Sequence, residues 1–190
     1  MSVRPLIAAL LAVAATFAIA VAPAQAADPI PVTGVDTRLA LDPAAGAALT
    51  SLGVRVQPTT AATVDETGRV VFPITGGSLT PELKGTVGHS GGLALKKGFV
   101  NINVQRFIID LRGEPKLNVE LRGLGIRFDL ARLTNISVAA GTGGATVVTA
   151  DVELTQFAAS VLNFAFGTRA LTSGFKLGTA TATVTLGAAS

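Results

Sequence analysis

The sequence predicts a mainly β protein, an antiparallel β-sandwich or partly open barrel that carries two short helices. Three observations predict this class: apolar and polar residues alternate along many segments, glycine-rich breaks separate those segments, and only two stretches have helical spacing. Strict alternation puts apolar side chains on one face of a strand and polar ones on the other, which is typical of antiparallel strands over one core. The clearest alternating segments are 100–105, 116–122, 126–130, 148–154 and 180–186.

Two segments break the alternation and are predicted to be helical. The first spans 44–52, with Asp42 as its N-cap and Pro43 at the first helical position. The second spans 156–166, with Thr155 as its cap, and a glycine follows each segment to end the helix. Both helices are short and apolar, so we expect them to cover an end or an opening of the sheet.

The N-terminal residues 1–26 are predicted to be a secretory signal peptide. Arg4 supplies the positive start, 6–21 is an apolar run, and 24–26 is a small-x-small cleavage site. The alternative, a transmembrane anchor, is disfavoured because a run of about 16 residues is shorter than the roughly 20 that a spanning helix needs. The expected location is therefore secreted, extracellular or associated with the cell wall.

The chain after the signal peptide is expected to form a flexible lead-in at 27–34 and a single domain at 35–190. The lead-in prediction rests on Pro29, Pro31 and Gly34. No second long apolar run occurs, so no membrane span is expected after cleavage. Without cysteine, this exported domain must be stabilised by core burial and sheet hydrogen bonds alone.

The composition argues against several classes of function. The chain has one histidine and no cysteine, tyrosine or tryptophan, so the usual proton-transferring and nucleophilic groups are nearly absent. We therefore expect no enzyme and no catalytic residues. Basic and acidic side chains alternate between 106 and 132, which indicates a solvated sheet face, and no nucleic-acid partner is expected.

The segment Gly88–Gly92 fits the G-x-S-x-G pattern of a hydrolase nucleophile elbow, with Ser90 at its centre. The elbow needs a separate histidine and a following helix, whereas the single histidine here is the neighbouring His89 and a strand follows. A glycine turn between two strands is the favoured interpretation. A metal site is not expected either, because His89 would have only carboxylates as partner ligands.

The phenylalanines of the second predicted helix leave two interpretations open. Phe157 and Phe164 recur at helical spacing, together with Val161. They either belong to the core, which is the favoured interpretation, or line an apolar ligand pocket beneath the helix. The candidate ligand-binding residues are therefore His89, Ser90, Phe157 and Phe164.

Residues 72–77, Phe-Pro-Ile-Thr-Gly-Gly, and 85–95, Gly-Thr-Val-Gly-His-Ser-Gly-Gly-Leu-Ala-Leu, resemble the signature of the HtaA domain. The resemblance implies a β-rich, secreted or surface-exposed module of actinobacterial haem uptake. It places His89 where the family has a histidine that supports the axial haem ligand. That ligand is a tyrosine in haem-binding members, and this chain has none, so a phenolate-bound haem is excluded.

Two hypotheses follow. The first is a secreted, non-enzymatic, HtaA-like binding module of the cell envelope or extracellular space, with an apolar ligand such as haem or a lipid. No resident cofactor is expected, and haem is the one candidate. The alternative is a structural or adhesive envelope protein that contacts another envelope protein and has no small-molecule ligand.

Overall fold

The structure, a computed structural model, describes residues 28–187, and the expected signal peptide therefore lies outside the described residues. Strands dominate the described part of the chain, and its two α-helices are α1 (Pro43–Ser51) and α2 (Gln156–Phe166). A short 3₁₀ turn covers Thr142–Gly144. The strands are β1 (Ile30–Leu41), β2 (Arg55–Thr59), β3 (Thr63–Val64), β4 (Val70–Leu79), β5 (Gly85–His89), β6 (Gly92–Lys97), β7 (Val100–Asp110), β8 (Lys116–Leu121), β9 (Ile126–Ala140), β10 (Thr146–Leu154) and β11 (Lys176–Leu186).

The sheet closes into a barrel. Its strands follow the order β7-β5-β4-β1-β11-β10-β9-β8, and a further pairing between β7 and β8 joins the two ends of this series. All of these pairs are antiparallel. The predicted mainly β class with two short helices is thus confirmed, and the sheet forms a barrel and not a sandwich.

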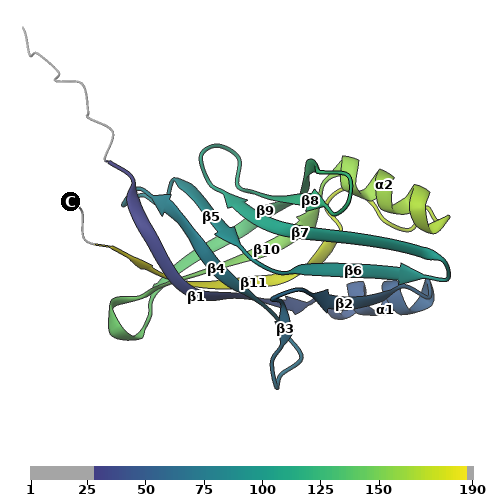
Figure 1. Cartoon of the computed structure of the whole chain (residues 1–190), viewed down its shortest axis with the longest axis horizontal. Coiled ribbons are helices and arrows are strands. Elements are labelled where there is room, and N and C mark those ends of the chain that lie inside the picture. Colours follow the sequence, from purple (N-terminus) through teal and green to yellow (C-terminus); the bar gives the residue numbers. More distant parts are fainter. Residues whose placement is uncertain (1–27, 188–190) are drawn as a thin grey trace, which may run out of the picture.

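Strands β5 and β6 both pair with β7 on the same side, and only Ser90 and Gly91 separate them. They therefore act as one bent strand along β7. At the bend the neighbours change: β5 pairs with β4, whereas β6 pairs with β2. The barrel wall consequently splays at the end where α1 connects β1 to β2 (Figure 1).

Both helices begin as their sequences predict. The backbone N–H of Ala44 donates to Asp42 Oδ1 at 2.9 Å, and that of Ala158 donates to Thr155 Oγ1 at 3.1 Å. Gly167 ends α2 in the left-handed conformation with φ 62°, which glycine adopts without steric strain. Both helices lie at one end of the barrel, opposite the end where β1 begins (Figure 1). Neither described helix has the length and apolarity of a membrane-crossing segment.

The predicted lead-in at 27–34 is wrong from Ile30 onward, because β1 starts there and pairs with β4 and β11. Pro31 is tolerated near the start of the strand, where its carbonyl still accepts a hydrogen bond from Gly187 N at 3.0 Å. Val32 is 3% exposed and anchors the segment in the core. Burial of one apolar side chain therefore outweighs the turn signal of the prolines.

The core has two parts that differ in position along the barrel. A smaller cluster fills the end where β1 begins, and the larger cluster extends from the middle of the barrel to the helices. Packing at the first end is tight, because Leu79 and Val184 are each only 2% exposed. The smaller cluster consists of Val32, Leu79, Val87 and Val184.

Leu79→Ala is expected to lower the free energy of unfolding by about 3 kcal/mol, since it removes a fully buried side chain and leaves a void in a packed region. Val138, which is 54% exposed, is the matched control, and Val138→Ala should change stability by less than about 0.5 kcal/mol. Denaturant unfolding of both variants measures the difference. Equal stability of the two would contradict a packed interior at this end.

Candidate ligand-binding site

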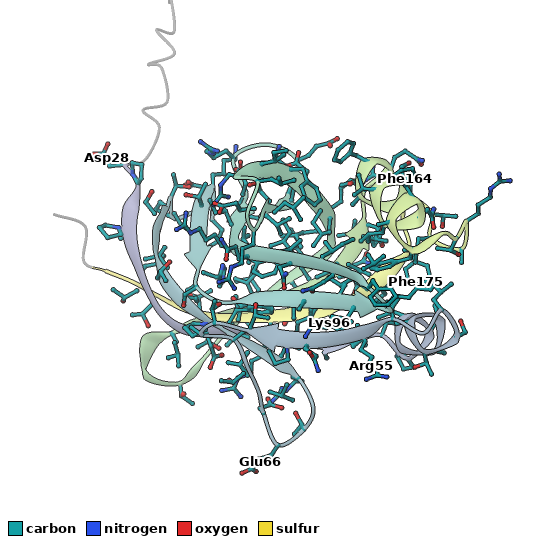
Figure 2. The ribbon with its side chains drawn as sticks, turned by 45° about the vertical axis from the view of Figure 1, so that its right-hand side comes forward. Asp28, Arg55, Glu66, Lys96, Phe164 and Phe175 are labelled. Atoms are coloured by element: carbon teal, nitrogen blue, oxygen red, sulfur yellow. The ribbon has the colours of Figure 1, made fainter. Side chains whose placement is uncertain are left out.

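An apolar cavity of about 400 Å³ opens at the helix end of the barrel. Its walls come from α1, α2, β6, β7 and β8, and all but three of its lining residues are apolar. Phe164 and Phe175 both lie at this end of the barrel, whereas Asp28 lies at the other (Figure 2). The three polar lining residues are Asn101, Asn103 and Arg122.

Helix α2 shapes the cavity because the first turn of its buried face has only small side chains. Ala158 and Ala159 are at most 1% exposed, so the helix backbone approaches the sheet closely. Val161 and Ala165 line the cavity without filling it. The space beneath the helix is therefore a consequence of short side chains where larger ones would complete the core.

The interpretation of Phe157 and Phe164 as core residues is wrong. Phe157 is 60% exposed and packs edge-on against Phe128, with ring centroids 5.7 Å apart. Phe164 is 92% exposed at the rim of the apolar cavity. Helical spacing predicted a shared face, but the buried face is the neighbouring one, which contains Leu162 and Phe166.

His89 lies inside the barrel, away from the cavity opening, and is 5% exposed. Its Nε2 is 2.7 Å from Thr37 Oγ1, and its Nδ1 is 3.3 Å from the carbonyl oxygen of Phe107. Burial lowers the pKa of His89 to about 4, since desolvation disfavours the charged ring more than hydrogen bonding to backbone carbonyls favours it. The imidazole is therefore neutral at pH 7.

A second, smaller space of about 70 Å³ adjoins His89 and Thr37. Four leucines line both this space and the apolar cavity: Leu39, Leu93, Leu130 and Leu177. His89 does not line the larger cavity, so the structure does not bring it together with Phe164 there.

Ser90 belongs to the bend between β5 and β6, as the glycine-turn interpretation predicts. Its backbone N–H donates to the carbonyl oxygen of Pro73 at 3.0 Å. Gly91 has φ 95° and lies so close to Ala62 that a side chain would collide. Because both ring nitrogens of His89 bond elsewhere, Ser90 and His89 do not form a nucleophile–base pair.

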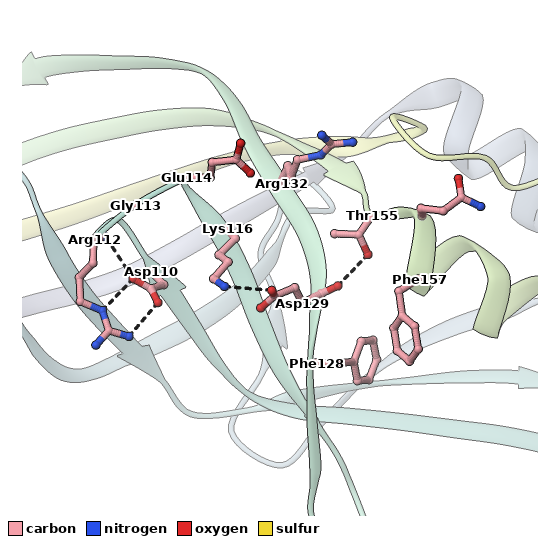
Figure 3. Close-up of a pocket in the computed structure, with 11 residues that line it drawn as sticks. Asp110, Arg112, Gly113, Glu114, Lys116, Phe128, Asp129, Arg132, Thr155 and Phe157 are labelled. Atoms are coloured by element: carbon pink, nitrogen blue, oxygen red, sulfur yellow. Dashed lines mark hydrogen bonds and ion pairs between the residues drawn. The ribbon is translucent and has the colours of Figure 1, made fainter.

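A wider groove of about 950 Å³ lies beside the N-terminus of α2, and Phe157 belongs to it. Its charged side chains pair with one another: Arg112 binds Asp110 at 2.8 Å, and Lys116 binds Asp129 at 3.0 Å (Figure 3). The guanidinium of Arg112 lowers the pKa of Asp110 to about 2. These two pairs neutralise four of the charges, while Glu114 and Arg132, which also line the groove, form no ion pair within the described part of the chain. The mixed charge of the groove makes it a weaker candidate for an apolar ligand than the apolar cavity.

Iron-bound haem does not fit the donor groups of the apolar cavity. Axial ligands to haem iron are imidazole, thiolate, thioether or phenolate groups, and none of these lines the cavity. His89 is the one imidazole, and it lines the smaller space and not the apolar cavity. Among residues 28–187, no group of three His, Cys, Asp or Glu side chains could hold a metal ion.

No known family model matches the chain, and no curated protein matches it. Two solved structures from Corynebacterium glutamicum do. The C-terminal domain of HtaA matches with a TM-score of 0.62 and 17% identity, covering 83% of this chain and 99% of that domain. This chain has the HtaA-type fold. The haem-binding protein HtaB matches with a TM-score of 0.55 and 13% identity, covering 83% of this chain and 96% of HtaB.

The fold that the sequence resemblance implied is therefore confirmed over most of the described chain. Identities of 17% and 13% support shared architecture, and the residues of this chain decide the chemistry of its site. Asn101, Asn103 and Arg122 were not predicted to line a site, since they lie in predicted strands with no motif. No signal in the sequence marks them, and Glu120 lies two residues before Arg122.

Stability should depend on pH through His89. In the unfolded chain this ring takes up a proton as the pH falls through about 6.5, whereas in the folded protein it does so only near pH 4. The contribution of the neutral His89 ring to the free energy of unfolding is therefore complete above about pH 6.5 and is lost as the pH falls toward 4. The loss amounts to about 3 kcal/mol.

His89→Gln is the control, because glutamine keeps hydrogen-bonding capacity and does not titrate. Its free energy of unfolding should vary little between pH 6.5 and 4.5, while that of the unsubstituted protein falls. Urea unfolding at several pH values measures both slopes. Identical slopes would show that another group causes the acid sensitivity.

Proposed function

We propose that this chain is a non-enzymatic binding module that holds an apolar small molecule in the cavity at the helix end of its barrel, and that it acts outside the cell. The single observation that supports this is the cavity itself. Its volume of about 400 Å³ lies within the range typical of small-molecule sites, and its lining is almost wholly apolar with a few polar groups.

The cavity also distinguishes the two hypotheses from the sequence. A structural or adhesive protein without a ligand would be stabilised by a filled interior, because each void between apolar side chains forgoes packing energy. Here the opposite end of the barrel is filled and the helix end is not. Retention of the space at one end supports a role in binding, with the ligand-free hypothesis as an outcome of the test.

In this proposal, haem is a candidate ligand only through its apolar surface and not through its iron. HtaB is described as a haem-binding protein, and this chain shares its fold. The cavity here offers no iron ligand, so a tetrapyrrole would be held by contact with apolar side chains such as Leu95 and Phe175. Coordination of iron by this chain is therefore not part of the proposed function.

The cavity is tested with N-phenyl-1-naphthylamine, a neutral dye whose fluorescence rises in apolar surroundings. The mature protein should bind it, and Val161→Trp should weaken binding at least about tenfold, since the indole occupies the space that Val161 leaves open. Ser160→Trp is the matched control, because Ser160 is exposed on the same helix. It should leave the affinity unchanged.

Both variants introduce the only tryptophan in the chain, so each also reports its own surroundings by intrinsic fluorescence. Emission at position 161 should be quenched or shifted by the dye, and emission at position 160 should not. Absence of dye binding to the unsubstituted protein, with all variants folded by circular dichroism, would favour the structural or adhesive role.

A second measurement concerns the tetrapyrrole. Haemin and metal-free protoporphyrin IX should bind with similar affinity, because the iron finds no ligand on the protein. His89→Ala should leave the Soret band of a haemin mixture unchanged. Haemin binding at least tenfold tighter than protoporphyrin, together with a Soret change in His89→Ala, would contradict the absence of iron coordination.

A further inference from the structure

The opening of the apolar cavity, here called the mouth, has an unusual charge distribution. Arg122 is the one charged residue of the lining, and no aspartate or glutamate belongs to it. The chain segments that meet at this end are 43–54, 95–103, 121–126 and 156–171, and they also carry Lys96, Lys97 and Arg169 (Figure 1). Asp42 and Glu120 directly adjoin two of these segments.

None of the four cations of the mouth forms an ion pair with a carboxylate within residues 28–187. Arg55, Lys84 and Arg132 lack such a partner too, so what distinguishes Arg122 is its position in the cavity lining. Lys97 instead donates to the carbonyl oxygen of Phe166 at 2.6 Å, which ties the β6–β7 hairpin to the end of α2. Positive charge is thus left available beside an apolar space.

Arg122 is the one charged residue that lines the cavity. Its backbone N–H donates to the carbonyl oxygen of Asn103 at 2.9 Å, so its position is fixed against β7. Asn101 and Asn103 are the other polar residues of the lining, and they alternate along β7 with Ile102 and Val104, which pack in the core. Arg122 is therefore the one charged side chain beside a cavity whose lining is otherwise almost wholly apolar.

The surroundings of Arg122 are apolar and exposed. Leu124 is 67% exposed and Phe164 is 92% exposed, and both line the cavity at its mouth. A molecule seated here would bury these side chains while its polar end remained near the guanidinium. Acidic groups that would repel an anion are absent from all four segments.

Building on the proposed function, we infer that the ligand is an anionic amphiphile: an alkyl or similarly apolar body inside the cavity, with a carboxylate or phosphate head group at Arg122. The guanidinium matches both head groups, since its planar donors bind two oxygens at once. The cavity binds the apolar part of the ligand, and Arg122 at the mouth favours a negatively charged head group.

The test is displacement of N-phenyl-1-naphthylamine by ligands of equal chain length below their micelle concentrations: dodecanoate, dodecyl phosphate, dodecanol and dodecylamine. We expect the carboxylate and the phosphate to displace the dye about fivefold better than the alcohol, and the amine to be the weakest. The preference should shrink as sodium chloride is raised, because salt screens exposed charges.

Arg122→Gln should abolish the preference for anions, so that dodecanoate and dodecyl phosphate displace the dye no better than dodecanol does from the same variant. Lys84→Gln is the matched control, since Lys84 also lacks a carboxylate partner within the described chain and is not part of the cavity lining. It should retain the preference. Comparison of the carboxylate and phosphate arms shows which head group the mouth favours.

The outcomes separate the two proposals. If the dye binds but the alcohol displaces it as well as the anions do, or if Arg122→Gln keeps the anion preference, this inference is overturned and the proposed function stands. If the dye does not bind the folded, unsubstituted protein at all, the proposed function fails, and the inference fails with it.

Discussion

The pairing between β7 and β8 is the constraint on which the rest of the molecule depends. It places Val104 opposite Leu121 and Asp110 opposite Lys116, and it thereby closes a series of strands that would otherwise be an open sheet. Closure removes two sheet edges and encloses an interior that side chains must fill. A barrel of eight strands has an interior that side chains just fill or that holds one small ligand, so the filling decides between a structural and a binding role.

The packing of side chains in the interior differs from one end of the barrel to the other. At one end Leu79 and Val184 close the interior, and at the middle His89 and Thr37 form a hydrogen-bonded pair that links β5 to β1 across β4. At the other end the wall splays and two alanine-rich helices cover it without reaching into the space. Because the chain has no disulfide, the packed end and the satisfied polar pair must supply the rigidity that the open end lacks.

The features that the sequence predicted correctly are local ones. Alternation in 148–154 and the caps at Asp42 and Thr155 depend on near neighbours, and the structure has each of them. Barrel closure depends on pairing between distant strands, and alternation does not report it. Helical spacing favoured the core for Phe157 and Phe164, yet the sheet packs against the neighbouring face of α2, which contains Ala158, Ala159, Leu162 and Phe166. The site residues were not predicted from the sequence. An apolar cavity arises where side chains are small, and no sequence motif indicates an unfilled volume.

The HtaA-type fold separates two properties that a haem-binding site combines: an apolar enclosure and an iron ligand. In this chain the enclosure follows from barrel closure and from the two helices that cover one end. No residue that lines it is of a type that ligates haem iron. The residues at the site therefore decide its chemistry independently of the fold. The proposed preference for a negative charge beside an apolar body rests on electrostatics, because Arg122, the one charged residue of the lining, has no carboxylate partner within residues 28–187.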